Sequence, residues 1–205
     1  MVFVAHCLLN ENVRFLGGAT RPGAVCEAVA PYLRDGVGIV QLPCPEQHAW
    51  GGVLKRWMLT LYGRRVLRWS PVRRPLVVLV RWATAVRYGH LARRTAREIV
   101  DYVTSGFEVV GVVGVGASPS CGVATTLDLD AAVAAMARCD SDTLSPSAVV
   151  EQVVAANVVD GEGLYVATLR RHLARRGVAV PFGEHDLLAE PCAAGSDRST
   201  GPRDH

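Results

Sequence analysis

The sequence predicts an α/β fold with a mostly parallel β-sheet. Continuous apolar segments rich in β-branched residues alternate along the chain with segments of helical periodicity. Polar residues do not occupy every second position of the apolar segments, so we expect strands that are buried on both faces, as in parallel sheets. The chain has 205 residues, 50% of them hydrophobic, which is enough for one domain with a sizeable core.

Four apolar segments are expected to form the strands. The second contains Pro43 and Pro45, which break a strand because proline withholds a backbone N–H donor. The third contains the glycine-rich run 111–116, which lacks the pattern of a phosphate-binding loop and is more simply explained by close backbone approach. The four segments are residues 2–9 (VFVAHCLL), 37–46 (VGIVQLPCPE), 107–118 (FEVVGVVGVGAS) and 178–185 (VAVPFGEH).

Helical segments are expected between these strands. Gly36 and Gly106 are stop signals at the ends of the first two helices. Residues 1–190 are expected to form a single domain, and the polar segment 191–205, rich in small residues, is expected to be a disordered tail. The expected helices are residues 23–36, 90–106 (the clearest part of an Arg-rich helical stretch, 53–103), 145–158 and 163–177.

Charge and hydropathy indicate a soluble cytoplasmic protein. The net charge is only +3, and the basic residues concentrate in residues 55–97. We interpret this stretch as a solvated helix face, with an anionic partner such as a nucleotide or RNA as the alternative. The N-terminus lacks the features of a secretion signal, and the most apolar run, 75–80, is far shorter than the roughly 20 residues that span a bilayer.

Three of the six cysteines occupy equivalent positions. Cys7, Cys44 and Cys121 each lie at or just past the end of an expected strand. Ligand sites in open α/β sheets form outside the carboxyl ends of the strands, so we expect the three thiols to meet at one edge. In a reducing compartment such cysteines are buried, metal-binding or catalytic rather than paired in disulfides.

Polar neighbours distinguish these cysteines from ordinary buried ones. A lone cysteine at a strand end is usually a small buried hydrophobic residue. Polar groups at a strand exit are costly to bury unless something pairs with them, so their presence beside each thiol favours a functional site. These neighbours are His6 and Asn10 near Cys7, Glu46 after Cys44, and Ser118 and Ser120 before Cys121.

The residue types leave three kinds of chemistry open. Three converging thiolates suit a zinc site, completed by a fourth protein ligand or a water, or an iron–sulfur cubane with one open iron. No CxxC pair is present to favour either metal. In a metal-free alternative, Cys121 is a nucleophile activated by a helix N-terminus and by His6.

Several motifs together resemble the thiouracil desulfidase family and its relatives of unknown function. Three of them contain the cysteines, and their order and separation match the family's pattern. A fourth segment resembles the C-terminal part of one subgroup of these desulfidases. The resemblance covers residues 2 to about 186. Its motifs are HCLLNENVR (6–14), LPCPE (42–46), GASPSCGV (116–123) and DGEGLYVATLRRHLARRGVAVPF (160–182).

The resemblance implies a fold, a cofactor and a reaction. The fold is a single Rossmann-like domain with helices on both faces of the sheet. The cofactor is a [4Fe–4S] cluster held by Cys7, Cys44 and Cys121, with its fourth iron open to the sulfur of a thiocarbonyl. Glu46 and Ser118 match the family's active-site positions. The implied activity is the hydrolytic, non-redox release of sulfide from a small thiolated heterocycle similar to thiouracil.

The resemblance also implies roles for individual residues. Glu46 is the expected general base for the attacking water. Ser118 is expected to hold the substrate or to relay a proton, although a turn or capping role is the alternative. Apart from the resemblance, the position of His6, Asn10 and Ser120 beside the cysteines places them on the substrate side, with a structural histidine and a loop-pinning asparagine as the alternatives.

The expected partners are the thiolated small molecule and the Fe–S assembly machinery that loads the cluster. No membrane partner is expected, and a nucleic-acid partner is disfavoured. Sulfur insertion into tRNA is also disfavoured, since the sequence lacks a loop for activating the base with ATP. Two other functions remain open: a non-catalytic Fe–S or sulfide-carrying module, and a cluster-free cysteine hydrolase with Cys121 as nucleophile. The oligomeric state is left open.

Overall fold

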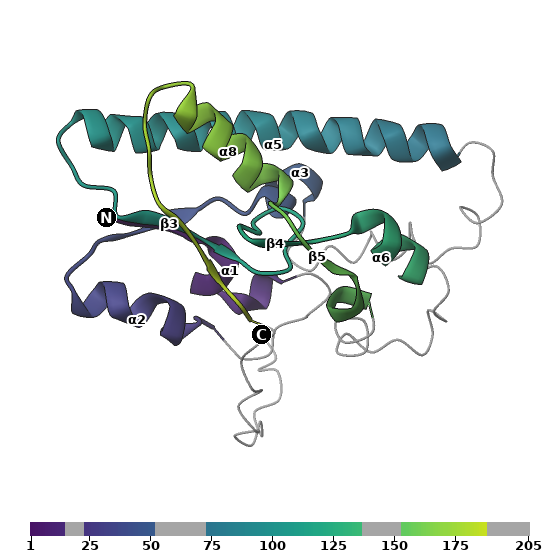
Figure 1. The fold of residues 1–205 in the computed structure, drawn as a ribbon, viewed down its shortest axis with the longest axis horizontal. Coiled ribbons are helices and arrows are strands. Elements are labelled where there is room, and N and C mark those ends of the chain that lie inside the picture. The colour runs from purple at the N-terminus through teal and green to yellow at the C-terminus, as the bar shows by residue number, and fades with distance from the viewer. Residues whose placement is uncertain (15–22, 52–72, 137–152, 188–205) are drawn as a thin grey trace, which may run out of the picture.

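The protein has an α/β architecture built on a four-stranded, all-parallel sheet (Figure 1). This computed structural model describes residues 1–14, 23–51, 73–136 and 153–187. The strand order is β2-β1-β3-β6, so the predicted α/β fold with a mostly parallel sheet is confirmed. The strands are β1 (Val2–Ala5), β2 (Ile39–Leu42), β3 (Gly111–Val115) and β6 (Phe182–His185).

The register of the sheet aligns the carboxyl ends of its strands. Ala5 at the end of β1 pairs with Leu42 at the end of β2. On the other side of β1, Val4 pairs with Val113, two residues before β3 ends at Val115. The segments that follow β1, β2 and β3 therefore leave the sheet at one edge.

The described helices include short ones close to the carboxyl edge of the sheet and longer ones packed along it. The long helix α5 and helix α8 run beside each other along the sheet, whereas α1 and α3 are short and directly follow β1 and β2 (Figure 1). The helices are α1 (His6–Leu9), α2 (Cys26–Arg34), α3 (Pro45–Trp50), α5 (Arg73–Thr104), α6 (Leu129–Met136) and α8 (Leu164–Ala174), with the 3₁₀ helices η1 (Glu11–Val13) and η5 (Ala155–Asn157).

Side-chain alternation along the strands divides the buried residues into two clusters. Phe3 of β1 and Val112 of β3 belong to a cluster with apolar residues of α5 and α8. Their neighbours Val2, Val4 and Val113 belong to a second cluster, with apolar residues of α2. Successive side chains of a strand point to opposite sides, so the strands contribute to both clusters. This explains why β1 and β3 are apolar throughout.

A buried hydrogen bond joins the two long helices of the first cluster. Tyr165 of α8 is 0% exposed, and its hydroxyl donates to Oγ1 of Thr95 on α5 at 2.8 Å. Thr95 is itself buried. The bond satisfies both hydroxyls inside the apolar cluster and sets the position of α8 along α5.

A second, two-stranded antiparallel sheet was not predicted. It consists of β4 (Thr125–Leu127) and β5 (Val158–Asp160), whose register pairs Thr125 with Asp160 and Leu127 with Val158. Both strands are only three residues long, and β5 begins 31 positions after β4 ends, so no local turn signal in the sequence indicates that they pair. Val158, expected to end a helix, begins β5 instead.

Several expected boundaries shift, because short helices start as soon as the strands end. β1 ends at Ala5, and the residues His6–Leu9 form α1 rather than the end of the strand. β2 ends at Leu42, and α3 begins at Pro45, where proline is favoured at the first helical position because it lacks the N–H that would be unsatisfied there. Expectations for residues 53–72, 145–152 and 188–205, including the tail, lie outside the described residues.

None of the described helices, including α5 with its 32 residues, has an apolar stretch of the length and hydropathy needed to cross a membrane. Arginines interrupt α5 throughout its length. Arg81 is one of them, and it forms an exposed ion pair with Asp130 of α6 at 3.0 Å.

Candidate functional site at the carboxyl edge of the sheet

The structure brings the three predicted cysteines to one edge of the parallel sheet. Cys7 lies in α1 directly after β1, Cys44 caps the N-terminus of α3 after β2, and Cys121 lies in the loop after β3. The thiols of Cys7 and Cys44 both act electrostatically on the Cys121 thiol, and Cys44 acts on Cys7. The three sulfurs are therefore close enough to influence one another, although they are far apart in sequence.

Burial keeps the thiols of Cys7 and Cys121 protonated. It raises the pKa of the Cys7 thiol to about 12; Arg14 opposes the shift, and Cys44 and Glu46 add to it. Burial likewise raises the pKa of Cys121, followed by the effect of Cys7, and the side chain is only 7% exposed. A thiolate here would need a cationic partner, since charge is costly in a low-dielectric site.

The donor set at this edge is sulfur-rich. In the parts of the chain that the structure describes, no three His, Cys, Asp or Glu side chains are arranged as a ready metal site. Cys26, on α2, is exposed and is not among the groups that act on Cys7 or Cys121. Cys7, Cys44 and Cys121 thus form the thiol group of the site, and thiols are the ligands that iron–sulfur clusters and zinc prefer.

Hydrogen bonds connect the Ser118–Gly122 loop to Glu46. Ser118 Oγ accepts the backbone N–H of Cys121 at 3.0 Å and lies 3.2 Å from Ser120 Oγ. Ser120 Oγ donates to Oε1 of Glu46 at 3.1 Å, and Ser120 is buried. The predicted site residues Glu46, Ser118 and Ser120 are therefore joined in one chain of hydrogen bonds that ends beside Cys121.

The N-terminus of α8 holds this loop through the backbone. Leu164 N–H donates to the carbonyl of Pro119 at 3.0 Å, and the N–H groups of Tyr165 and Val166 donate to the carbonyl of Ser120 at 3.1 and 3.2 Å. The first amides of a helix lack partners within the helix. Here the loop carbonyls supply the partners, so the loop and the start of α8 satisfy each other.

Two glycines allow the close approach of these backbones. A Cβ on Gly163 would lie 2.5 Å from the backbone carbon and oxygen of Ser120. A Cβ on Gly114 of β3 would lie 2.1 Å from the carbonyl oxygen of Cys121, which accepts the Val115 N–H at 3.0 Å. The expectation that glycines of the run 111–116 permit close backbone approach is confirmed at Gly114.

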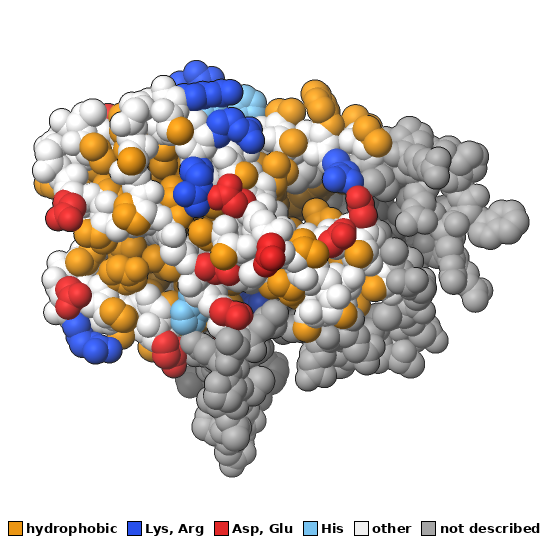
Figure 2. Space-filling model, viewed as in Figure 1, with side chains coloured by type: hydrophobic (Ala, Val, Ile, Leu, Met, Phe, Trp, Pro, Cys, Tyr) orange, Lys and Arg blue, Asp and Glu red, His pale blue; other side chains and the backbone are white. Residues whose placement is uncertain are grey.

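Glu184 fixes the other end of the loop to the sheet. Acidic side chains gather on the face over β4, β5 and β6 (Figure 2), and Glu184 belongs to β6. Its Oε2 accepts the backbone N–H groups of Val123, Ala124 and Thr125 at 2.6, 2.8 and 3.1 Å, and its Oε1 accepts the hydroxyl of Thr125 at 2.8 Å. Burial alone would raise the pKa of Glu184, but these hydrogen bonds to the charged form outweigh it and lower the pKa.

The segment after β1 uses its polar residues mainly to shape the chain. Asn10 is exposed, and its Oδ1 accepts the N–H of Asn12 at 3.2 Å, which caps η1. Glu11 is 0% exposed and pairs with Arg14 at 3.1 Å. This buried carboxylate was not predicted, and it holds Arg14, which opposes part of the rise in the pKa of Cys7. His6 is partly buried at the start of α1, next to Cys7.

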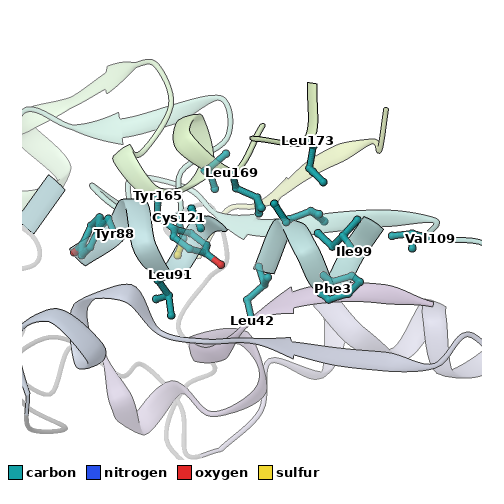
Figure 3. Close-up of a cluster of buried hydrophobic side chains, with 14 of the residues drawn as sticks. Phe3, Leu42, Tyr88, Leu91, Ile99, Val109, Cys121, Tyr165, Leu169 and Leu173 are labelled. Carbon is teal, nitrogen blue, oxygen red and sulfur yellow. The ribbon is translucent and has the colours of Figure 1, made fainter. Parts of the chain in front are cut away.

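Two residues of α5 adjoin the site and were missed by sequence reasoning. Arg87 donates to the carbonyl of Ala49 near the end of α3, and its guanidinium lies 5.9 Å from the centre of the Trp50 ring. Tyr88 is 5% exposed and belongs to the buried cluster that contains Cys121 (Figure 3). Burial raises the pKa of Tyr88, and Glu46, Cys121 and Cys44 raise it further.

The fold and the site define an α/β protein with one buried and two partly buried thiols, a carboxylate and hydroxyls at the carboxyl edge of a parallel sheet. Comparisons of the chain with protein-family models, curated proteins and solved structures returned no match. The resemblance suggested by the cysteine motifs therefore enters the functional argument only as a proposal.

The contact between Gly163 and the loop is testable by a single added methyl group. We expect Gly163→Ala to lower the free energy of unfolding by about 1–3 kcal/mol, because the methyl group overlaps backbone atoms that cannot move aside freely. Gly89→Ala is the control: it adds the same methyl in open space inside α5 and should raise stability by about 0.5–1 kcal/mol. Urea unfolding measures both. Equal effects of the two substitutions would show that the contact is unimportant.

The charge of Glu184 should make stability depend on pH. Because the folded state lowers its pKa, its contribution is present above the ordinary carboxyl pKa of about 4.3 and is lost as the pH falls through the folded value. Glu184→Gln should cost about 1–2 kcal/mol at neutral pH and flatten the stability profile in acid. Glu162→Gln removes an exposed ion pair with Arg170 and should change stability by less than about 1 kcal/mol. Parallel acid profiles for wild type and Glu184→Gln would contradict the assignment.

Proposed function

We propose that the protein is an iron–sulfur-dependent desulfidase that releases sulfide from the thiocarbonyl of a small thiolated heterocycle by hydrolysis. The observation that carries the proposal is that Cys7, Cys44 and Cys121 lie at one edge of the sheet. Cys44 and Glu46 both act electrostatically on the thiols of Cys7 and Cys121. The resemblance of the three cysteine motifs to the thiouracil desulfidase family supports the same conclusion.

The residues present fit a [4Fe–4S] cluster by the chemistry of their donors. Cys7, Cys44 and Cys121 would hold it, each from the end of a different strand of the sheet. When bound, such a cluster supplies an open iron that draws electron density from a thiocarbonyl sulfur. Three cysteines leave that iron without a protein thiolate, which suits a site that must admit a substrate.

Glu46 is positioned to act as the general base. A water molecule that loses a proton to Glu46 adds to the thiocarbonyl carbon, the C–S bond breaks, and the sulfur leaves as sulfide while the water oxygen remains in the product carbonyl. The thiocarbonyl carbon of the substrate and the carbonyl carbon of the product have the same oxidation level, so the reaction needs no electron donor. The hydroxyl of Ser120 holds Oε1 of Glu46 in place at 3.1 Å.

Ser118 supports the site rather than acting alone in it. Its Oγ accepts the Cys121 N–H and pairs with Ser120 Oγ, so it both shapes the loop and extends the hydrogen-bond chain from Glu46. A proton passed along that chain would move between Glu46 and the region beside Cys121. This combines the turn role and the relay role that the sequence left as alternatives.

A cluster-free hydrolase with Cys121 as nucleophile is less well supported. The raised pKa of Cys121 disfavours the thiolate that such a nucleophile needs. The loop leads into β4 rather than into a helix. The first amides of the nearby helix α8 donate to the carbonyls of Pro119 and Ser120. The N-terminus of α8 therefore does not activate the thiol.

The finer description of the fold belongs to the same proposal. We infer a single Rossmann-like domain with helices on both faces of the sheet, because the strands contribute to one buried cluster with α5 and α8 and to another with α2. The protein would work in the cytoplasm and receive its cluster from the Fe–S assembly machinery. Its substrate would be a free small molecule similar to thiouracil.

Replacing each cysteine separately tests the cluster. Cys7→Ser, Cys44→Ser and Cys121→Ser should each lose most of the iron and sulfide that the wild type binds on anaerobic reconstitution, because a hydroxyl is a poorer ligand for iron than a thiolate. Cys26→Ser changes an exposed cysteine away from the edge and should load like the wild type. Iron and sulfide analysis with visible absorbance measures loading. Full loading of all three variants would refute the ligand set.

Replacing the base separates cluster binding from catalysis. Glu46→Gln should bind iron normally and release sulfide about 10²–10⁴-fold more slowly, the usual contribution of a general base. Glu108→Gln, an exposed residue before the start of β3 at the opposite edge of the sheet, is the control and should keep full activity. A sulfide-release assay over thiolated pyrimidines and nucleosides gives the rates. A brown wild-type protein that cleaves none of them would favour the sulfide-carrying module instead.

A further inference from the structure

Tyr88 is a buried phenol beside the thiols that the proposed mechanism does not use. It is 5% exposed and lies in the same buried cluster as Cys121 and Tyr165 (Figure 3). Tyr165 in that cluster donates its hydroxyl to Thr95 at 2.8 Å. The hydroxyl of Tyr88 makes no hydrogen bond to any group in the described parts of the chain. The hydroxyl is not among the fully buried polar atoms that lack a partner in the described residues, so it lies where a ligand can reach it.

The position of Tyr88 is set by its neighbour on α5. Arg87 donates to the carbonyl of Ala49 and lies over the Trp50 ring, which docks this part of α5 against α3. The first turn of α3 carries Glu46, directly after Cys44 and Pro45. Glu46 is the charge that acts most strongly on the Tyr88 phenol, ahead of Cys121 and Cys44. Tyr88 is therefore held on α5 within reach of both the base and the thiols.

The chemistry of the residue restricts what it can do there. The environment of Tyr88 keeps the phenol neutral, so it offers an O–H donor and a flat aromatic ring at all ordinary pH values. A neutral donor beside a base is suited to hold a carbonyl oxygen of a planar ring, while the ring face packs against the heterocycle. It is not suited to take the proton of the attacking water, which is the part assigned to Glu46.

We propose that Tyr88 is a specificity-determining residue that donates a hydrogen bond to a ring carbonyl of the substrate. The proposal rests on the proposed function and narrows its substrate class to planar heterocycles that carry a carbonyl acceptor in addition to the thiocarbonyl. Heterocycles with the thiocarbonyl alone would still react, without the selectivity that this hydrogen bond provides.

The test crosses two variants with two substrates. 2-Thiouracil carries a ring carbonyl, and pyrimidine-2-thione is the same ring without that oxygen. In Tyr88→Phe, kcat/KM for 2-thiouracil should fall about tenfold, the effect of one hydrogen bond, while the value for pyrimidine-2-thione and the iron content stay unchanged. Tyr165→Phe is the matched control: it removes a hydroxyl whose partner is Thr95, so it should lower the melting temperature and affect both substrates equally.

The outcomes separate this proposal from the function on which it rests. An equal loss for both substrates in Tyr88→Phe would show a structural role and overturn the proposal. If the wild type cleaves neither substrate, the proposed desulfidase activity fails. The role of Tyr88 is then tested by the binding of the oxygen analogues of the two substrates, uracil and pyrimidin-2-one. Wild type should then bind uracil about tenfold more tightly than pyrimidin-2-one, and Tyr88→Phe should abolish the difference. No such preference in the wild type, or no binding of either analogue, would overturn the proposal.

Discussion

The contact on which the site depends is the capping of α8 by the backbone of the Ser118–Gly122 loop. Carbonyls of Pro119 and Ser120 accept the first amides of α8, so the loop gains a rigid support and the helix loses its unsatisfied donors. The approach is so close that no Cβ fits at Gly163. Because Ser120 also bonds to Glu46, the same contact positions the thiol of Cys121 and the carboxylate of the neighbouring helix together.

The parallel sheet explains why cysteines so far apart in sequence share one edge. β1, β2 and β3 run in one direction, and their carboxyl ends lead to Cys7, Cys44 and Cys121. Burial keeps the thiols of Cys7 and Cys121 protonated, so binding of the proposed cluster would release protons and would couple cluster loading to pH. The cationic core of the proposed cluster would offset the cost of thiolate charge in this buried environment.

The long helix α5 contributes to the site as well as to the core. One part of it packs on α8 through the buried bond between Thr95 and Tyr165, and an earlier turn contacts α3 through Arg87. Tyr88 lies between these two contacts. A helix held at both of these points is a firm base for a side chain that must distinguish substrates, because small displacements of a donor weaken a hydrogen bond steeply.

The sequence by itself determined the parallel sheet, the positions of Cys7, Cys44 and Cys121 at its edge, and the nearness of Glu46 to them, because strand hydrophobicity and strand ends are local properties. Only the tertiary structure decided how the loop is held. The β4–β5 pair, the amides that bind Glu184, the capping of α8 and the approach of Tyr88 all join residues distant in sequence. Such contacts depend on how the elements pack, and neither composition nor periodicity records packing.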